Sequence, residues 1–245
     1  MLGKFFRSQG YKMLKRAVKL NNRILDLRAR PPAAATGFAP FDEIADRAGK
    51  RSDINEHLAT LFVETLAARP KLIVELGVRG GESTFAFERA AALVGAKLVS
   101  VDIEDCTKAS NYPGWDFVKS DDVAFAGQFP GWCRARGLEP MIDVLFIDSS
   151  HLYEHTVREI DSWFPHLSPR AKVIFHDTNL KRLYFRRDGS WALGWDNERG
   201  VIAAIERFFG ARFDEAAEFV DFRRGWIIRH DPWCAGLTII DRVLD

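Results

Sequence analysis

A glycine-rich turn that directly follows an apolar run constrains this chain more than any other feature. Residues 71–84 read KLIVELGVRGGEST, which predicts a buried strand up to Gly77 and a helix after Gly81. Glycine lacks a Cβ, so the chain can turn sharply there and a ligand can approach the main chain closely. Backbone N–H groups at the start of the following helix would face such a ligand. The segment therefore predicts a strand–loop–helix unit with a ligand site at the turn.

Three later apolar runs also end in polar residues. Run 97–101 ends at Asp102, run 144–146 precedes Asp148, and run 173–175 precedes His176. Open parallel α/β sheets bind their ligands at the carboxyl ends of the strands. We therefore expect the polar residues that follow these runs to converge at one edge of a sheet.

Helical patterns precede and separate the apolar runs, at 53–68, 82–94, near 124–136, 153–167 and 201–209. Alternation of strands and helices is typical of a parallel sheet covered on both faces. Two closing runs, 217–222 and 225–229, are joined by a tight Arg-Arg turn, which favours an antiparallel pair. The predicted fold class is α/β, a Rossmann-like doubly wound sheet, mostly parallel with an antiparallel edge strand.

The loop departs from two common phosphate-binding loops. It lacks the Gly-Lys-Ser/Thr ending of a P-loop, and two residues separate Gly77 from the next glycine, unlike G-x-G-x-x-G. A glycine-rich turn can also do no more than close a strand–helix junction. Glu75 adds information, because a carboxylate inside a strand is costly to bury without a partner. We expect it to accept hydrogen bonds near the loop or the ligand.

With an acid before the glycine loop and a second acid ending strand two, the sequence resembles the class I S-adenosylmethionine-dependent methyltransferases over roughly residues 54 to 209. The resemblance implies S-adenosylmethionine as cofactor. Its implied contacts are Glu75, Gly77 and Gly81 at the methionine end, Ser83 and Thr84 at the methionine carboxylate, Asp102 at the ribose and Asp121 at the adenine. Ser83 and Thr84 are alternatively helix-start residues, and Asp122 competes with Asp121.

The later strand ends narrow the resemblance to metal-dependent O-methyltransferases, of the catechol type and the macrolide-sugar type that includes macrocin enzymes and a cephalosporin hydroxylase-like group. In those enzymes the acids that end strands four and five bind Mg²⁺, and Asp148 and Asp177 match them. His176, Thr178 and Asn179 compete for the third position. The predicted metal site is Asp148, His176 and Asp177, with Mg²⁺ or Mn²⁺ bound.

His151 stands three residues after Asp148, where the resemblance places a general base, Lys in the catechol type and His in the sugar type. A neutral imidazole can take the proton of a metal-bound alcohol near its ordinary pKa. The sequence predicts a metal-dependent O-methyltransferase that acts on a sugar hydroxyl of a glycan or glycosylated natural product. The alternatives are a catechol-like phenolic O-methyltransferase and a non-catalytic binding protein with the cofactor fold. His151 could also be an ordinary loop histidine.

The first 30 residues are strongly basic, with nine Lys and Arg against Asp26, a net +8 that leaves −7 for the rest. Their apolar residues recur at helical spacing, which predicts a basic amphipathic helix. We expect residues 1–37 to form this helix and a linker, and 38–245 to form the S-adenosylmethionine-dependent methyltransferase domain. The helix could contact a membrane surface, pair with a partner subunit or pack on its own domain.

Composition indicates a cytoplasmic enzyme: three cysteines without metal or disulfide spacing, and no apolar run of membrane-spanning length. The acidic body argues against nucleic acid as a partner. Residues 180–200 combine aromatic and basic side chains, which indicates either a lid that stacks on a sugar acceptor or a surface contact. We expect a homo-oligomer.

Overall fold

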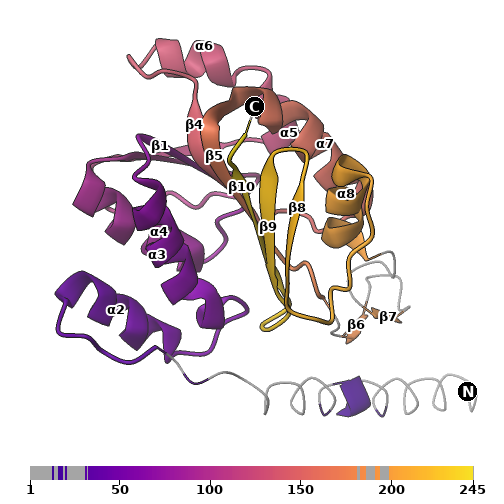
Figure 1. Cartoon of the computed structure of the whole chain (residues 1–245). Helices are drawn as coiled ribbons and strands as arrows, with labels where there is room; N and C mark the ends of the chain where they lie inside the picture. The colour runs from indigo at the N-terminus through magenta and orange to yellow at the C-terminus, as the bar shows by residue number, and fades with distance from the viewer. Residues whose placement is uncertain are drawn as a thin grey trace, which may run out of the picture.

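The computed structural model describes residues 13, 16–18, 20, 31, 33–180, 183–185, 191–193 and 199–244. Its centre is an eight-stranded sheet in the order β3-β2-β1-β4-β5-β10-β9-β8 (Figure 1). The strands are β1 (Leu72–Leu76), β2 (Lys97–Asp102), β3 (Trp115–Lys119), β4 (Ile142–Ile147), β5 (Leu167–His176), β8 (Phe219–Arg223), β9 (Trp226–Asp231) and β10 (Leu237–Arg242). Strands β1 to β5 are parallel, and β10, β9 and β8 extend the sheet in antiparallel pairs. The predicted fold class is confirmed.

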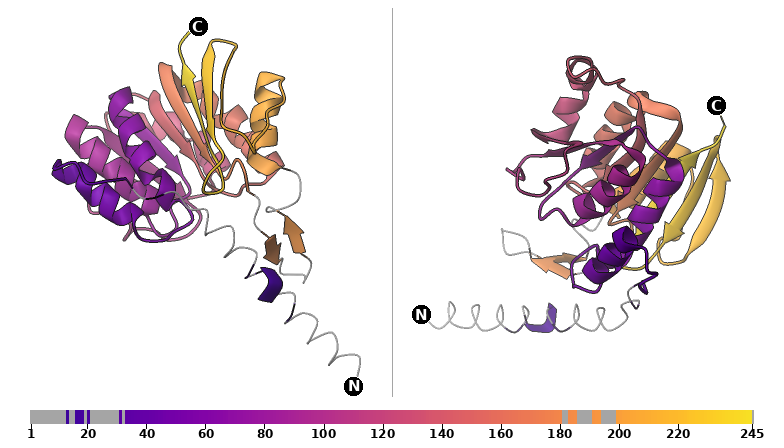
Figure 2. Two further views of the ribbon diagram at one scale, coloured as in Figure 1. Left: turned by 60° about the horizontal axis from the view of Figure 1, so that its bottom comes forward. Right: turned by 90° about the vertical axis from the view of Figure 1, so that its left-hand side faces the viewer.

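Helices cover both faces of this sheet (Figures 1 and 2). They are α2 (Ala39–Ala48), α3 (Leu58–Ala68), α4 (Glu82–Val94), α5 (Asp122–Ala126), α6 (Phe129–Arg134), α7 (Tyr153–Trp163) and α8 (Gly200–Phe209). Ile73 packs with α2, α3 and α4, whereas its neighbours Leu72 and Val74 pack with α5 to α8. Because both faces are covered, every residue of β1 is buried, as is typical of central parallel strands.

Three local features differ from the sequence prediction. The helix expected around 124–136 is split into α5 and α6, with Gly127 ending the first and Pro130 inside the first turn of the second. Helix α3 begins at Leu58, after a short 3₁₀ turn over Asn55–His57. Strand β10 was not predicted, although Leu237–Ile240 is a buried run. It lies between β5 and β9 and joins the closing hairpin to the parallel strands.

Two predicted segments fall largely outside the described residues. In the expected basic helix at 1–30, residues 13, 16–18 and 20 are helical, and the others lie outside the described part. In the expected lid at 180–200, the strands β6 (Leu183–Phe185) and β7 (Trp191–Leu193) form an antiparallel pair. The side chains of residues 181–198 lie outside the described part of the chain. Among the helices that the structure describes, none is long and apolar enough to cross a bilayer.

Candidate functional site

The glycine loop is built directly against the end of β4. Gly77 has φ 93°, its N–H donates to the carbonyl of Val101 at 2.9 Å, and a Cβ there would collide with the carbonyl of Asp148. Gly81 has φ 77° and precedes α4, and a Cβ there would come within 2.9 Å of the Ala109 Cβ. Only glycine satisfies both requirements at these positions. The loop and the strand-four acid therefore belong to one site.

Glu75 is completely buried beneath this loop and is surrounded by hydroxyl groups. Its carboxylate accepts hydrogen bonds from Ser83 Oγ at 2.6 Å, Thr84 Oγ1 at 2.8 Å and Ser100 Oγ at 2.6 Å. Burial raises the pKa of Glu75 to about 7. The hydroxyl hydrogens of Ser83 and Thr84 thus bind a protein carboxylate. A role for these two residues at the methionine carboxylate stays a prediction, and their backbone N–H groups at the start of α4 are what could serve it.

Asp102 holds the other side of the loop. Its Oδ2 accepts from the backbone N–H groups of Val78 at 2.8 Å and Arg79 at 3.1 Å, and its Oδ1 accepts from Glu104 N–H at 2.8 Å. A carboxylate has about four acceptor positions, so this pattern leaves room for little more than one further donor. Asp102 therefore fixes the loop, and its predicted contact with a ribose remains a prediction.

The two acids after β3 have different surroundings. Asp121 is exposed and caps α5 by accepting from Ala124 N–H at 2.8 Å. Asp122 is buried, with its carboxylate on the ring of His155. Of the two, Asp121 is the one that faces solvent. The prediction that it contacts the adenine stays open.

Asp148, His151 and Asp177 converge at the carboxyl ends of β4 and β5, with one ligand atom from each within 4.8 Å of the others. His151 Nε2 lies 3.3 Å from Asp177 Oδ2, and His151 Nδ1 lies 3.8 Å from Asp148 Oδ1. We call these three residues the strand-end group. All three side chains are 13–16% exposed. The convergence expected from the strand ends is thus present.

The backbone of the strand-end group is unusual. His151 has φ 58° and Asp177 has φ 56°, a left-handed conformation that costs on the order of 1–3 kcal/mol for a residue other than glycine. Gly200 packs so closely that a Cβ there would collide with the carbonyl of His151. Surroundings that impose such conformations are frequent at functional sites. This geometry makes the strand-end group a candidate functional site.

His176, the last residue of β5, lies behind the two acids. It is 1% exposed, its Nε2–H donates to the carbonyl of Cys234 at 3.2 Å, and its Nδ1 lies 3.1 Å from Asp148 Oδ1. Nδ1 is also 3.5 Å from Asp177 Oδ1. Although burial opposes the charged form, the charges of Asp148 and Asp177 raise the pKa of His176 well above its ordinary value. Its Nδ1 faces both carboxylates.

The other two candidates for the third metal position turn elsewhere. Thr178 Oγ1 lies 3.4 Å from His230 Nδ1, and Asn179 Nδ2 donates to the carbonyl of Pro232 at 2.8 Å. Both are buried against the β9–β10 connection. The structure thus brings His176 and His151 to the two acids, and it directs the side chains of Thr178 and Asn179 away to that connection.

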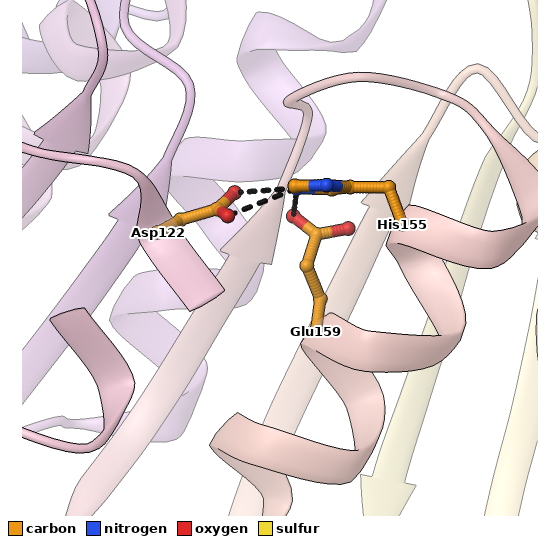
Figure 3. A group of neighbouring side chains, drawn as sticks. All are labelled: Asp122, His155 and Glu159. Carbon is orange, nitrogen blue, oxygen red and sulfur yellow. Dashed lines mark hydrogen bonds and ion pairs between the residues drawn. The ribbon is translucent and has the colours of Figure 1, made fainter. Parts of the chain in front are cut away.

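One group of residues was missed in the sequence. His155 has no partner spacing in the sequence that assigns it to the site, and in the structure its Nε2 lies 2.9 Å from Asp122 Oδ1 (Figure 3). Glu159 completes a second compact group of possible metal ligands. The available signal was the spacing of four residues between His155 and Glu159, which places both on one face of a helix.

A comparison with known protein families finds a match to a methyltransferase domain. Residues 74–178 match the family described as a methyltransferase domain. This stretch runs from β1 to just beyond β5 and contains the glycine loop and the strand-end group. This part of the chain, less than half of it, thus matches a methyltransferase domain, and the fold around it is the Rossmann-like fold of solved methyltransferases.

Individual relatives are distant. An uncharacterized protein of Sinorhizobium fredii, y4gI, is 29% identical over 138 residues, which is 51% of this chain and 15% of that protein. The MycE methyltransferase of the mycinamycin pathway, solved with Mg, S-adenosylhomocysteine and mycinamycin VI, is 15% identical over 83% of this chain and 54% of that one, with a TM-score of 0.53. An O-methyltransferase of Bacillus cereus in complex with S-adenosylhomocysteine is 12% identical over 91% and 97%, with a TM-score of 0.51. At such identities these structures show the fold.

Proposed function

We propose that the protein transfers a methyl group from S-adenosylmethionine to a sugar hydroxyl of a glycan or glycosylated natural product, with the help of a divalent metal. The observation that carries this proposal is the contact between the glycine loop and the strand-end group, where Gly77 packs on the carbonyl of Asp148. A cofactor on the loop and an acceptor at the acids would then be neighbours. Proximity is the main requirement of an in-line methyl transfer.

The residues fit a divalent cation. Asp148 and Asp177 supply carboxylate oxygens, and His176 turns Nδ1 to both of them while its Nε2–H is held by the carbonyl of Cys234. Metal-ligating histidines usually donate their other ring N–H to a carbonyl or carboxylate in this way. We assign Asp148, His176 and Asp177 as the residues that would hold Mg²⁺ or Mn²⁺. The bound ion would lower the pKa of an acceptor hydroxyl.

His151 is the proposed general base. Its ring lies beside Asp177 and Asp148, at 3.3 and 3.8 Å, so a proton taken from the acceptor would form an imidazolium next to two acids. Neighbouring carboxylates stabilise that charge and orient the ring. The sugar class of acceptor rests on His151, since the resemblance to catechol enzymes would require Lys. It also rests on the likeness to MycE, solved with mycinamycin VI.

Metal dependence tests the proposal most directly. The chelated protein should bind S-adenosylhomocysteine but should not methylate any acceptor in a panel of glycosides and catechols, and Mg²⁺ or Mn²⁺ should restore turnover. Asp148→Asn and Asp177→Asn should abolish turnover and keep cofactor affinity within about twofold. Asp161→Asn, an exposed acid that pairs only with Arg207 among its described contacts, is the matched control. Full turnover in chelator would contradict the metal, and turnover on catechols alone would contradict the sugar acceptor.

A further inference from the structure

A second group of possible ligands, which the proposed reaction does not use, joins two helices beside the sheet. Asp122 is the first residue of α5, and His155 and Glu159 lie four residues apart on one face of α7. Figure 3 shows both carboxylates at the same end of the imidazole, where His155 Nε2 lies. His155 Nε2 lies 2.9 and 3.2 Å from the oxygens of Asp122 and 3.8 Å from Glu159 Oε1. We call these three residues the helix group.

The helix group is largely withdrawn from water, and Arg158 contacts its outer ring nitrogen, His155 Nδ1. The side chains of Asp122, His155 and Glu159 are 7%, 14% and 0% exposed. Glu159 Oε1 accepts from Ser149 Oγ at 2.6 Å, but Glu159 Oε2 is fully buried and has no hydrogen-bond partner among the described residues. A buried carboxylate oxygen without a donor costs about 1–3 kcal/mol or more. Glu159 thus lacks a hydrogen-bond donor at Oε2, and a bound cation or a proton would stabilise its carboxylate.

We propose that Asp122, His155 and Glu159 bind a divalent transition-metal ion, with Zn²⁺ as the ion that fits best. One imidazole nitrogen and two carboxylates form a donor set that suits Zn²⁺ better than Mg²⁺. Ligands with bonds of about 2.0–2.2 Å lie about 3–3.5 Å apart around such an ion, close to the observed separations from 2.9 to 3.8 Å.

One contact must change when the metal binds. Arg158 Nη2 lies 3.3 Å from His155 Nδ1, so it donates to that nitrogen, and the ring proton is on Nε2. Ligation through Nε2 moves the proton to Nδ1, and Arg158 then has to turn away. This is feasible because Arg158 is exposed on α7. Arg158 thus competes with the metal.

Such a site would act on the reaction centre through structure. Ser149, which donates to Glu159, directly follows Asp148 and lies two residues before His151. An ion on the helix group would tie α5 to α7 and hold the β4–α7 loop in place. The helix group shares no residue with the strand-end group or with His176, so the two metal proposals can be tested separately.

The experiment measures Zn²⁺ bound by the full chain after removal of metals with chelator. Asp148→Asn with Asp177→Asn serves as the background that lacks the proposed catalytic metal site. We expect one equivalent of Zn²⁺ in this background by elemental analysis, and an absorption band of four-coordinate cobalt when Co²⁺ replaces it. Adding His155→Gln or Glu159→Gln should weaken binding more than roughly 100-fold, beyond the 10–100-fold cost of losing an outer partner.

Two controls exclude a folding artefact. His166→Gln changes a partly buried histidine that faces the carbonyl of Ala126, and it should leave Zn²⁺ binding unchanged. Arg158→Gln removes the competitor for Nδ1 and should tighten Zn²⁺ binding severalfold, which a folding defect cannot imitate. No Zn²⁺ in the background, or equal binding with and without His155, would overturn the proposal and leave a shared proton in the group. Loss of turnover in the variant with Asp148→Asn and Asp177→Asn tests the proposed function and says nothing about the helix group.

Discussion

The strand-end group and the helix group contain the same kinds of side chain, two carboxylates and one imidazole, but the chain builds them differently. In the strand-end group, His151 and Asp177 adopt a left-handed backbone conformation, and the group lies against two close glycines, Gly77 and Gly200. In the helix group, none of the three has a positive φ. Regular helices place side chains at fixed spacing, whereas loops at strand ends can aim them at a ligand. Under the proposed function, turnover depends on the strand-end group, and the helix group contributes to stability.

The largest expected effect is a difference in kcat between variants of His151 and His155. His151→Ala should lower kcat by about 10²–10⁴, the usual contribution of a general base. His155→Ala should lower the free energy of unfolding by about 3–5 kcal/mol, because it leaves buried acids without their partner, and it should lower kcat far less than His151→Ala does, because His155 acts on the β4–α7 loop and not on the acceptor. Kinetics and urea unfolding check both. The comparison fails if His155→Ala loses more turnover than His151→Ala.

Glu75, a buried acid that belongs to neither group, extends the comparison to the pH dependence of stability. Its pKa is raised from 4.5 to about 7 by burial, so between these values the unfolded chain has lost a proton that the folded chain keeps. Stability from this group is therefore present below pH 4.5 and is lost as the pH rises through 7, by about 3 kcal/mol. Glu75→Gln should lack this slope. Urea unfolding at pH 5 and pH 8 measures it, and parallel slopes in both proteins would refute the assignment.

The smallest expected effect concerns Asp102, which binds the loop and not the strand-end group. Asp102→Ala should weaken S-adenosylhomocysteine binding by about 1.5–3 kcal/mol, the value of hydrogen bonds to a charged group. The reason is the loss of its bonds to Val78 and Arg79 N–H together with the predicted ribose contact. Calorimetry measures the affinity. Asp102→Asn can keep one acceptor, so its affinity for S-adenosylhomocysteine should lie between those of the wild type and Asp102→Ala. Equal affinity in all three proteins would remove Asp102 from the site.

The sequence predicted the parts of the fold that depend on local signals. Helix α4 has the predicted bounds because Gly81 and Gly95 adopt left-handed conformations at its two ends. Strand β10 was missed because its role depends on pairing with β5, some 60 residues earlier. A short apolar run carries no information about which strand it will join.

For the site, the rule that polar residues gather at strand ends predicted that Asp148, His151, His176 and Asp177 would meet. It could not predict which oxygen accepts from which donor. The bonds from Ser83 and Thr84 to Glu75 depend on the angle at which α4 leaves the loop. The pair of Asp122 and His155 depends on how closely α5 approaches α7, which the order of strands in the sheet determines.

The position of β10 also affects how the protein is made. His176 is held by the carbonyl of Cys234, and the residues after it are held by Ala235 and Gly236. A ribosome that adds about 5–20 residues per second needs roughly 3–12 seconds to travel from β5 to β10. During that interval the β5 edge is unpaired, and exposed strand edges associate readily with other chains. Asp148 and Asp177 are thus synthesised before the segment that holds His176, and the β5 edge is covered only once β10 pairs with it.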